Sequence, residues 1–492
     1  MRASLLTFLL ACVIRAYAGV ILPTPQSVTP LPGEFRATAS LSVKACEKAQ
    51  KALALFNQHI APLVTATAAP QIIMEENDTL SAEAYTLAIS QSRIVLQAST
   101  EAGFIYGVQS LRQWGNKGND GWTFPCVNII DRPRLKWRAF MLDSGRQFQP
   151  VDTIKKYIDM ASALKMNCFH WHLTEGLGWR AEIKEYPELT KTGAFVGKGP
   201  EQQGFYTRAD MEEVVRYAAA RGVNIMPEID IPGHAEAALY AYPLLGCTNQ
   251  KPPIPETGFT PNIFCAGSDF TVVFLKRVLL EICDIFPFEY VHLGGDEAPK
   301  DNWDSCPKCR MKVRKLGLKD SHQLQLWLSA ELANHLATLG RKAVFYDDLV
   351  NNADGFPLPN NVVIQWWNYR TSGDKGLMNA LRHGYEVICA TNYYCYLNFP
   401  ETPWKGYGPE RTFDIFKAYL DNPSDRAAQC SPLVLGITAS IWTDYALTMD
   451  LLDYRLYPRI YALAEQMWHV GKRIPMQQFL QKIREHNAQS CK

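Results

Sequence analysis

A helix and a following strand can be read from residues 207–234, TRADMEEVVRYAAARGVNIMPEIDIPGH. Thr207 followed by Asp210 three positions later is a capping box that starts a helix, and Gly222 is the residue type that commonly ends one. Residues 224–229 form a nearly continuous apolar run, which is typical of a strand covered on both faces. Polar residues follow this run. The stretch therefore predicts one helix–strand unit of an α/β fold, with polar side chains at the carboxyl end of the strand.

The same alternation continues through residues 134–480, with further helical patterns near residue 154, after Ser268 and after Ser321. Eight strands are expected: Arg138–Asp143, Cys168–Leu173, Asn224–Ile229, Tyr290–Gly294, Ala343–Tyr346, Val362–Trp366, Glu386–Ala390 and Leu433–Ile441. Eight parallel strands with helical crossovers predict a catalytic (β/α)8 TIM barrel. Only 15 residues separate the fifth and sixth strands, without a clear helix, so an open doubly wound sheet stays the alternative.

The residues before the barrel divide into two segments. Residues 1–18 carry Arg2, an apolar run and a small-residue triplet ending at Ala18, which predict a signal peptide and export: periplasmic or secreted, or lysosomal in a eukaryote. A buried N-terminal helix and a lipoprotein signal at Cys12 are the alternatives. Residues 19–133 alternate short strands with a helix and predict a small α+β domain without catalytic residues.

Composition excludes several classes of protein. The chain has 492 residues, of which 47% are apolar and 20% charged, and its net charge of +1 provides no basic surface for nucleic acid or anionic lipid. Beyond the N-terminus no apolar run approaches the ~20 residues of a membrane span. Residues 481–492 are expected to form a C-terminal tail, and the oligomeric state stays open.

One pair among the 13 cysteines resembles half of a metal site. Cys306 and Cys309 are separated by Pro-Lys, and a zinc site of this kind needs two more ligands at matching spacing. No second C-x-x-C or H-x-x-x-H motif exists in the chain. We therefore expect a tight turn with free or locally paired thiols, with metal binding as the alternative.

The carboxyl ends of the predicted strands are rich in polar and aromatic side chains. They read Asp143-Ser-Gly-Arg146, His170-Trp-His-Leu-Thr-Glu175, Glu228-Ile-Asp-Ile-Pro-Gly-His234, His292-Leu-Gly-Gly-Asp-Glu297, Tyr346-Asp-Asp348, Trp366-Trp367, Tyr396-Leu-Asn398 and Trp442-Thr-Asp444. Barrel enzymes place their chemistry at this face. Aromatic faces combined with carboxylates and arginine fit a sugar pocket.

These motifs resemble glycoside hydrolase family 20, the β-N-acetylhexosaminidases. The resemblance rests on His292-Leu-Gly-Gly-Asp-Glu297, on Asn167-Cys-Phe-His-Trp-His-Leu-Thr-Glu-Gly-Leu-Gly-Trp179, on Met226-Pro-Glu-Ile-Asp-Ile-Pro-Gly-His234 and on Ala102-Gly-Phe-Ile-Tyr-Gly-Val-Gln-Ser-Leu-Arg112. It covers most of residues 20–470 in the order of the family. It implies exo-acting, retaining hydrolysis of terminal β-linked N-acetylhexosamine (GlcNAc or GalNAc) from glycans, in which the acetamido oxygen of the substrate attacks its own anomeric carbon.

The resemblance also implies roles for individual residues. Glu297 would be the general acid and base, Asp296 would orient the acetamido group, and Tyr396 would donate to its oxygen. Other residues would bind the sugar, namely Arg146, Tyr346, Trp366, Asn398, Trp442 and Asp444, while Glu175 and His234 would form a relay to Glu297. The family needs no cofactor and no metal. Two alternatives stay open: a catalytically silent carbohydrate-binding barrel and a disaccharide-releasing relative.

Four of these positions differ from the family pattern. Glu175 and Asp444 exchange one acidic residue for the other, and Tyr346 stands where Trp is usual. Asn398 stands where Asp is usual, which predicts tolerance of a 6-sulfated sugar, or, as the alternative, ordinary hydroxyl binding by a neutral side chain.

Overall fold

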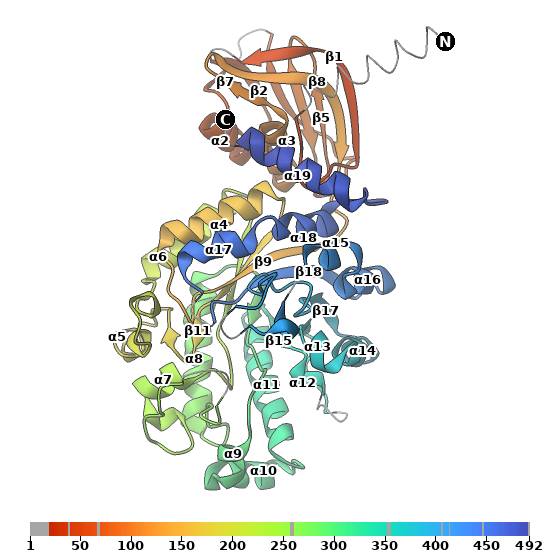
Figure 1. Ribbon diagram of the computed structural model, residues 1–492. Helices are drawn as coiled ribbons and strands as arrows, with labels where there is room; N and C mark the ends of the chain where they lie inside the picture. The colour runs from red at the N-terminus through yellow and green to blue at the C-terminus, as the bar shows by residue number, and fades with distance from the viewer. Residues whose placement is uncertain are drawn as a thin grey trace.

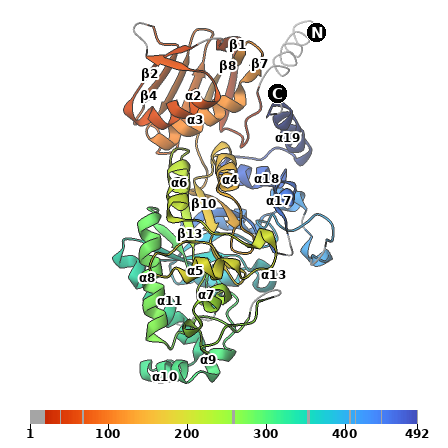
Figure 2. The ribbon, with the colours of Figure 1, turned by 90° about the vertical axis from the view of Figure 1, so that its left-hand side faces the viewer.

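The computed structural model describes residues 19–490 apart from residues 38–39, 66–68, 256–259, 352–355, 405–406, 413 and 445–446. A small domain built on a β-sheet stands at one end of a larger barrel domain, and the last helix, α19 (Met476–Ser490), lies beside the small domain (Figures 1 and 2). The expected signal peptide, residues 1–18, lies outside the described residues. Among the residues that are described, no helix is long and apolar enough to cross a membrane.

Eight parallel strands close into a barrel in the order β10-β13-β14-β15-β16-β17-β18-β9. Their bounds are β9 (Trp137–Asp143), β10 (Cys168–His172), β13 (Asn224–Glu228), β14 (Tyr290–His292), β15 (Lys342–Tyr346), β16 (Val362–Trp366), β17 (Glu386–Cys389) and β18 (Val434–Ile441). Every expected strand is present within two residues of its expected ends. The predicted (β/α)8 barrel is confirmed, and the open doubly wound sheet is wrong.

Helices cover the outside of the barrel. The longer ones are α4 (Val151–Ala163), α6 (Arg208–Ala219), α8 (Asp269–Ile285), α10 (Pro307–Leu316), α11 (Ser321–Thr338), α14 (Lys375–Arg382), α16 (Pro423–Cys430), α17 (Met449–Leu456) and α18 (Arg459–Trp468). Shorter ones are α5 (Glu188–Lys191), α7 (Glu236–Ala241), α9 (Asp301–Ser305), α12 (Asp348–Asn351), α13 (Tyr369–Ser372) and α15 (Ile415–Leu420). Helix α6 begins with the predicted capping box, in which Thr207 accepts from the backbone of Asp210 and Asp210 accepts from that of Thr207.

The interior of the barrel is apolar at one end and polar at the other. Side chains alternate along each strand, so that on β10 Cys168, His170 and His172 point inward while Phe169 and Trp171 pack outward. Apolar residues such as Met226 and Val344 fill the amino-terminal end of the barrel. Histidines and a glutamate occupy the next layer toward the carboxyl ends, directly beneath the position expected for the site.

The small domain has its own apolar core. Its sheet has the order β1-β8-β5-β6-β4-β2-β3, with β7 paired to β8. The strands are β1 (Ser27–Ala37), β2 (Leu41–Ala45), β3 (Leu63–Thr65), β4 (Ile72–Glu76), β5 (Tyr85–Ile89), β6 (Ile94–Ala98), β7 (Asn116–Gly118) and β8 (Gly121–Asp131), and the helices are α2 (Gln50–His59) and α3 (Glu101–Trp114). Residues 481–490, expected as a tail, instead form the last ten of the 15 residues of α19, which packs back on the chain: Nδ1 of His486 lies 3.1 Å from the carbonyl oxygen of Val20.

Buried ion pairs join the two domains. Lys165 Nζ, on the barrel side, lies 2.8 Å from Asp131 Oδ2 at the end of β8, and both side chains are fully buried. The indole of Trp468, at the end of α18, donates to the same carboxylate at 2.9 Å. Arg138 on β9 pairs with Glu83 of the small domain at 2.6 Å. These contacts fix the small domain on the barrel.

We expect Lys165→Met to lower the free energy of unfolding by about 3–5 kcal/mol, since it leaves Asp131 buried without its cation. Urea denaturation followed by tryptophan fluorescence measures the effect. The exposed pair of Lys156 with Asp453 provides the control, because Lys156→Met should change stability by less than about 0.5 kcal/mol. Equal stability of the two variants would contradict this account of the domain interface.

Candidate active site

A cavity of about 230 Å³ opens at the carboxyl ends of the barrel strands. It is lined by Arg146, Glu175, Asp230, His234, Asp296, Glu297, Trp367, Asn368, Arg370, Thr371, Asn392, Tyr396, Asn398, Phe399, Arg411, Trp442 and Asp444. Nine of the 11 residues predicted for the site are in this set. A larger cavity of about 500 Å³ lies between the domains, but its lining has one carboxylate, Asp159, and no aromatic–carboxylate cluster of this kind.

Glycines place the Asp296–Glu297 pair at the end of β14. Gly294 and Gly295 have φ angles of +65° and +97°, which side chains rarely adopt. A Cβ on Gly294 would lie only 1.7 Å from Oδ1 of Asp230, so the backbone can approach that carboxylate only as glycine. Glu297 itself has a φ of +43°. The chain thereby turns so that two consecutive carboxylates reach one cavity from different depths.

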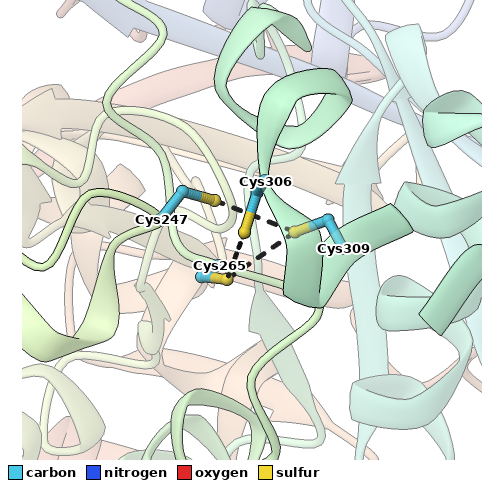
Figure 3. Close-up of side chains that lie close together, drawn as sticks. All are labelled: Cys247, Cys265, Cys306 and Cys309. Atoms are coloured by element: carbon cyan, nitrogen blue, oxygen red, sulfur yellow. Dashed lines mark hydrogen bonds between the residues drawn. The ribbon is translucent and has the colours of Figure 1, made fainter. Parts of the chain in front are cut away.

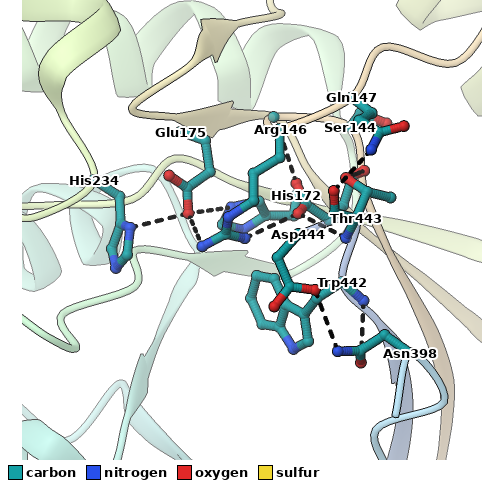
Figure 4. Close-up of polar contacts among 12 residues, drawn as sticks. Ser144, Arg146, Gln147, His172, Glu175, His234, Asn398, Trp442, Thr443 and Asp444 are labelled. Atoms are coloured by element: carbon teal, nitrogen blue, oxygen red, sulfur yellow. Dashed lines mark hydrogen bonds and ion pairs between the residues drawn. The ribbon is translucent and has the colours of Figure 1, made fainter. Parts of the chain in front are cut away.

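Glu297 lies at the end of a relay of alternating charge. Its Oε2 is 3.7 Å from Nε2 of His234, whose Nδ1 is 2.9 Å from Oε1 of Glu175. Glu175 in turn pairs with Arg146, which also bonds Asp143 at 2.9 Å (Figure 4). The predicted relay residues are therefore in line with the predicted acid.

The contacts within the relay lower the pKa of Glu175 and raise that of His234. Burial opposes ionisation of Glu175, but Arg146 and His234 outweigh it and hold the pKa of Glu175 well below its usual range. Burial also opposes the charge of His234, yet Glu175 and Asp230 raise the pKa of His234 well above normal. The pair is consequently a carboxylate and an imidazolium at neutral pH. Burial raises the pKa of Glu297, with His234 and Arg146 acting in the opposite direction, and the net shift favours the protonated form.

Asp296 is buried deeper than Glu297. The Glu297 side chain is 34% exposed, whereas Asp296 is 9% exposed and its Oδ1 has no partner among the described residues. Burial and the neighbouring Asp230 raise the pKa of Asp296 well above normal, and His234 lowers it. Burial also raises the pKa of Asp230 to about 7. The free oxygen of Asp296 is thus a hydrogen-bond acceptor, or a shared proton site, at the bottom of the pocket.

Three aromatic side chains surround Asp296. Tyr396 stacks parallel to Trp367 with ring centres 6.4 Å apart, and it lies 5.9 Å from Trp442. Burial, then the charge of Asp296, raises the pKa of Tyr396 well above normal, so its hydroxyl stays a donor. These rings form a largely apolar compartment, in which the Tyr396 hydroxyl and the indole N–H of Trp442, unpartnered among the described residues, are the hydrogen-bond donors.

Trp366 and Tyr346, both predicted to bind the sugar, lie outside that compartment. Trp366 is wrong as a pocket residue: it is the last residue of β16, it points outward into the core between strands and helices, and its indole donates to the carbonyl of Gly373. Its neighbour Trp367 lines the pocket, because alternate residues of a strand face opposite sides. Tyr346 does not line the cavity either; it lies fully buried below it and donates to Glu228 at 3.3 Å.

A group of polar side chains, Asn398, Tyr407 and Asp444, lies opposite the relay. Asn398 Nδ2 donates to the hydroxyl of Tyr407 at 3.1 Å and lies 3.4 Å from Oδ1 of Asp444 (Figure 4). Arg146 stacks over Trp442 at 5.2 Å and completes this side. Because the amide of Asn398 already faces a carboxylate, this geometry favours ordinary hydroxyl binding; tolerance of a 6-sulfate stays a prediction.

The sequence reasoning missed four residues that shape the site. Asp230 and Asp348 contribute carboxylates, and Asp348 accepts the indole N–H of Trp367 at 2.7 Å. The third residue is Trp367 itself. The fourth is Glu228, which lies 2.7 Å from His170 and 2.6 Å from His172. Asp230 and Glu228 belong to a strand end that the sequence analysis described as polar, so their position in the chain could have indicated them. The direction of the Trp367 side chain, in contrast, depends on where β16 ends.

Metal ligation offers no better account of these clusters. His170, Glu228 and His292 lie close enough to hold an ion, as do Asp230, His234 and Asp296. In the first group, however, both histidines lie within ion-pair distance of one carboxylate, and the second group is joined to the Glu175 relay. A third group, of four cysteines, lies outside the cavity.

An eight-stranded barrel with two adjacent carboxylates in an aromatic-lined cavity at the carboxyl ends of its strands is typical of a glycoside hydrolase. Residues 135–470 match the family model described as glycosyl hydrolase family 20, catalytic domain, and residues 19–132 match glycosyl hydrolase family 20, domain 2. The chain belongs to glycosyl hydrolase family 20. The predicted family and the predicted enzyme class are confirmed.

Relatives of known name agree with this assignment. A beta-hexosaminidase of Porphyromonas gingivalis is 35% identical over 79% of this chain, which spans only about half (51%) of that protein. One from Vibrio furnissii is 32% identical over 90% of this chain and 76% of its own. The crystal structure of a beta-N-acetylhexosaminidase from Bacteroides fragilis superposes with a TM-score of 0.92 at 52% identity, covering 95% of both chains. An exo beta-N-acetylglucosaminidase from Vibrio harveyi, solved with N-acetylglucosamine, gives 0.85 at 27% identity, covering 96% of this chain and 78% of its own.

We expect Glu228→Gln to destabilise the protein by about 3–5 kcal/mol, because it leaves the buried imidazolium of His172 without its main counter-charge. Burial opposes that charge, and Glu228 is the strongest influence that raises the pKa of His172 well above normal. Thermal unfolding measures the effect. Glu212→Gln, which removes an exposed ion pair with Arg208, is the matched control and should leave Tm nearly unchanged.

Proposed function

We propose that this protein removes terminal β-linked N-acetylhexosamine from the non-reducing ends of glycans, with retention of anomeric configuration. The observation that carries the proposal is the unequal depth of the two adjacent carboxylates. Glu297 lies near the opening, where a leaving group would stand, and Asp296 lies at the bottom beside Tyr396 and Trp442. Two consecutive residues are poorly placed to act on opposite faces of a sugar, as most retaining enzymes require, whereas substrate-assisted hydrolysis needs only one acid–base residue.

In the first step Glu297 would give its proton to the glycosidic oxygen. Its raised pKa supports this role, because a general acid must be protonated at the working pH. The acetamido oxygen of the substrate attacks C1, and the C1–leaving-group bond breaks. The product is a cyclic oxazolinium ion held on the sugar itself. Glu297, now a carboxylate, then takes a proton from the water that opens this ring.

Asp296 and the aromatic compartment would act on the acetamido group. The unpartnered Oδ1 of Asp296 can accept the acetamido N–H and stabilise the positive charge that develops there. Tyr396 can donate to the acetamido oxygen, and Trp367 with Trp442 can enclose the methyl group. A preorganised environment of this type holds the nucleophile in attack geometry before the bond breaks.

The size of the cavity supports an exo mode of action. Its volume of about 230 Å³ lies below the ~300–1,000 Å³ that is usual for drug-sized ligands, so it suits one sugar unit better than an extended chain. Arg146, Asn398 and Asp444 would bind the hydroxyls of that unit. A disaccharide-releasing enzyme would need a longer groove.

Export is a separate proposal, which rests on residues 1–18 alone. Arg2, the apolar run and the triplet ending at Ala18 support a cleaved secretory signal, so that the enzyme would act outside the cytoplasm on extracellular or periplasmic glycans. N-terminal sequencing of the mature protein tests it, with Gly19 as the expected first residue.

We expect Asp296→Asn to lower kcat on a chromogenic β-N-acetylglucosaminide by on the order of 10²–10³, as loss of an electrostatic partner of the transition state does. Glu297→Gln should abolish hydrolysis while sugar binding persists. Early-time NMR of the wild-type reaction should show the β-anomer as the first product. An inverted product would contradict the acetamido mechanism, and binding without hydrolysis by the wild type would favour the silent carbohydrate-binding barrel.

The relay predicts a change in pH dependence. Since the His234 imidazolium lowers the pKa of Glu297, His234→Gln should raise that pKa and move the basic limb of the kcat/KM profile to higher pH. His322→Gln, on the exposed surface of α11, is the control and should leave the profile in place. A basic limb that stays unchanged or moves to lower pH in His234→Gln would show that the relay does not act on the acid.

A further inference from the structure

Four cysteines from distant parts of the chain converge on one point outside the cavity (Figure 3). Cys247 and Cys265 lie in the long connection between β13 and α8, and Cys306 and Cys309 lie at the junction of α9 and α10, which follow β14. In both overall views α9 and α10 are at the end of the molecule opposite the small domain (Figures 1 and 2). The cluster therefore joins the loops that leave two neighbouring barrel strands.

The sulfur–sulfur distances are those of a metal tetrahedron. Cys265 Sγ lies 3.6 Å from that of Cys309 and 3.9 Å from that of Cys306, and Cys309 Sγ lies 3.8 Å from that of Cys247. Four sulfurs at 2.3 Å from a tetrahedral zinc are about 3.8 Å apart. Cys265 and Cys309 each approach two others, so the arrangement is one cluster and not two separate pairs.

Three of the four cysteines are sealed from solvent, and two of the four lie at the start of a helix. Cys265, Cys306 and Cys309 are 0–4% exposed, and Cys247 is half-buried. Cys306 is the residue before the first turn of α10, and Cys309 lies within that turn, where the positive end of the helix stabilises negative charge.

The backbone is built for this close approach. A Cβ on Gly267 would lie 2.2 Å from the backbone nitrogen of Cys309, so the loop carrying Cys265 can touch α10 only because residue 267 is glycine. The backbone N–H of Cys265 donates to the carbonyl of Leu245 at 2.8 Å, which ties its loop to the segment that carries Cys247. Gly246 and Phe264 form a β-bridge at the same place.

We propose that Cys247, Cys265, Cys306 and Cys309 bind one structural zinc ion, which fixes the loops carrying the relay and the acid. Binding converts four thiols and Zn²⁺ into a tetrathiolate complex of net charge −2 and releases four protons. The loop after β13 carries Asp230 and His234, and the loop after β14 carries Asp296 and Glu297. The expectation of a tight turn with free or locally paired thiols, with metal binding as the alternative, was based on the missing second C-x-x-C motif; the other two cysteines, Cys247 and Cys265, are separated by 17 residues.

The test is the metal content of the full-length chain, purified from reducing cytoplasm and exchanged into metal-free buffer. We expect one equivalent of zinc per chain by plasma mass spectrometry. The native mass should exceed that of the metal-free chain by the mass of one zinc ion minus that of the protons released. Cys309→Ser and Cys265→Ser should lose the ion. Cys430→Ser, which changes an exposed cysteine at the end of α16, is the matched control and should keep one equivalent.

Measurements on the wild type decide the question even if the variants do not fold. Zinc removed by a thiol-directed mercurial should appear with a chelating dye at one equivalent, and Tm should fall as it leaves. After the mercurial is reversed with excess thiol, added Zn²⁺ should restore one equivalent and the original Tm, and Co²⁺ should give the visible spectrum of a tetrahedral thiolate complex. A reduced, folded chain that binds neither ion would overturn the proposal, and so would a mass lower by four hydrogens, which means two disulfides.

Discussion

The buried carboxylate of Glu228 is the interaction on which the site depends. It lies inside the barrel, where a lone charge is very costly, and it is stabilised by imidazoles from β10 and β14 and by the hydroxyl of Tyr346 from β15. Burial opposes its ionisation, but His172 and His292 hold the pKa of Glu228 well below normal. Four neighbouring strands thus share one polar centre, and their carboxyl ends keep the spacing that the cavity above requires.

Above that centre, charges of opposite sign alternate from Asp143 through Arg146, Glu175 and His234 to Glu297. Asp143, Arg146, Glu175 and His234 compensate one another, so these four buried groups can exist together without large net repulsion, and the partly exposed Glu297 ends the row. Asp230 and Asp296 stand outside this row, and burial raises the pKa of both carboxyl groups although His234 acts in the opposite direction. The fold in this way produces an ionised relay and a pair of carboxyls poised to share a proton within one pocket.

Most of the barrel could be predicted because each strand is a short apolar run followed by polar residues, and this pattern is local. The side of the strand to which an individual side chain points was harder to predict. Trp366 and Trp367 are adjacent, and only the exact end of β16 decides which of them enters the pocket. The residues that the resemblance assigned to the acid, its neighbour and the relay stand in contiguous motifs, and Glu297, Asp296, His234 and Glu175 all line one cavity. Glu228 gave no such signal, because its partners lie on three other strands. The four-cysteine cluster was missed for the same reason: it joins loops that are separated along the chain, and spacing within a single motif carries no information about such contacts.

Helix α19 has a consequence for how the two domains come together. It follows every barrel element in the chain, yet its residues contact the first described segment: His486 bonds Val20, and Lys482 bonds Thr24. The seam between the domains is therefore closed by a segment that is translated after both of them. Each domain can therefore fold in turn as it is synthesised, whereas the contacts that α19 makes with the first segment can form only after both domains are complete.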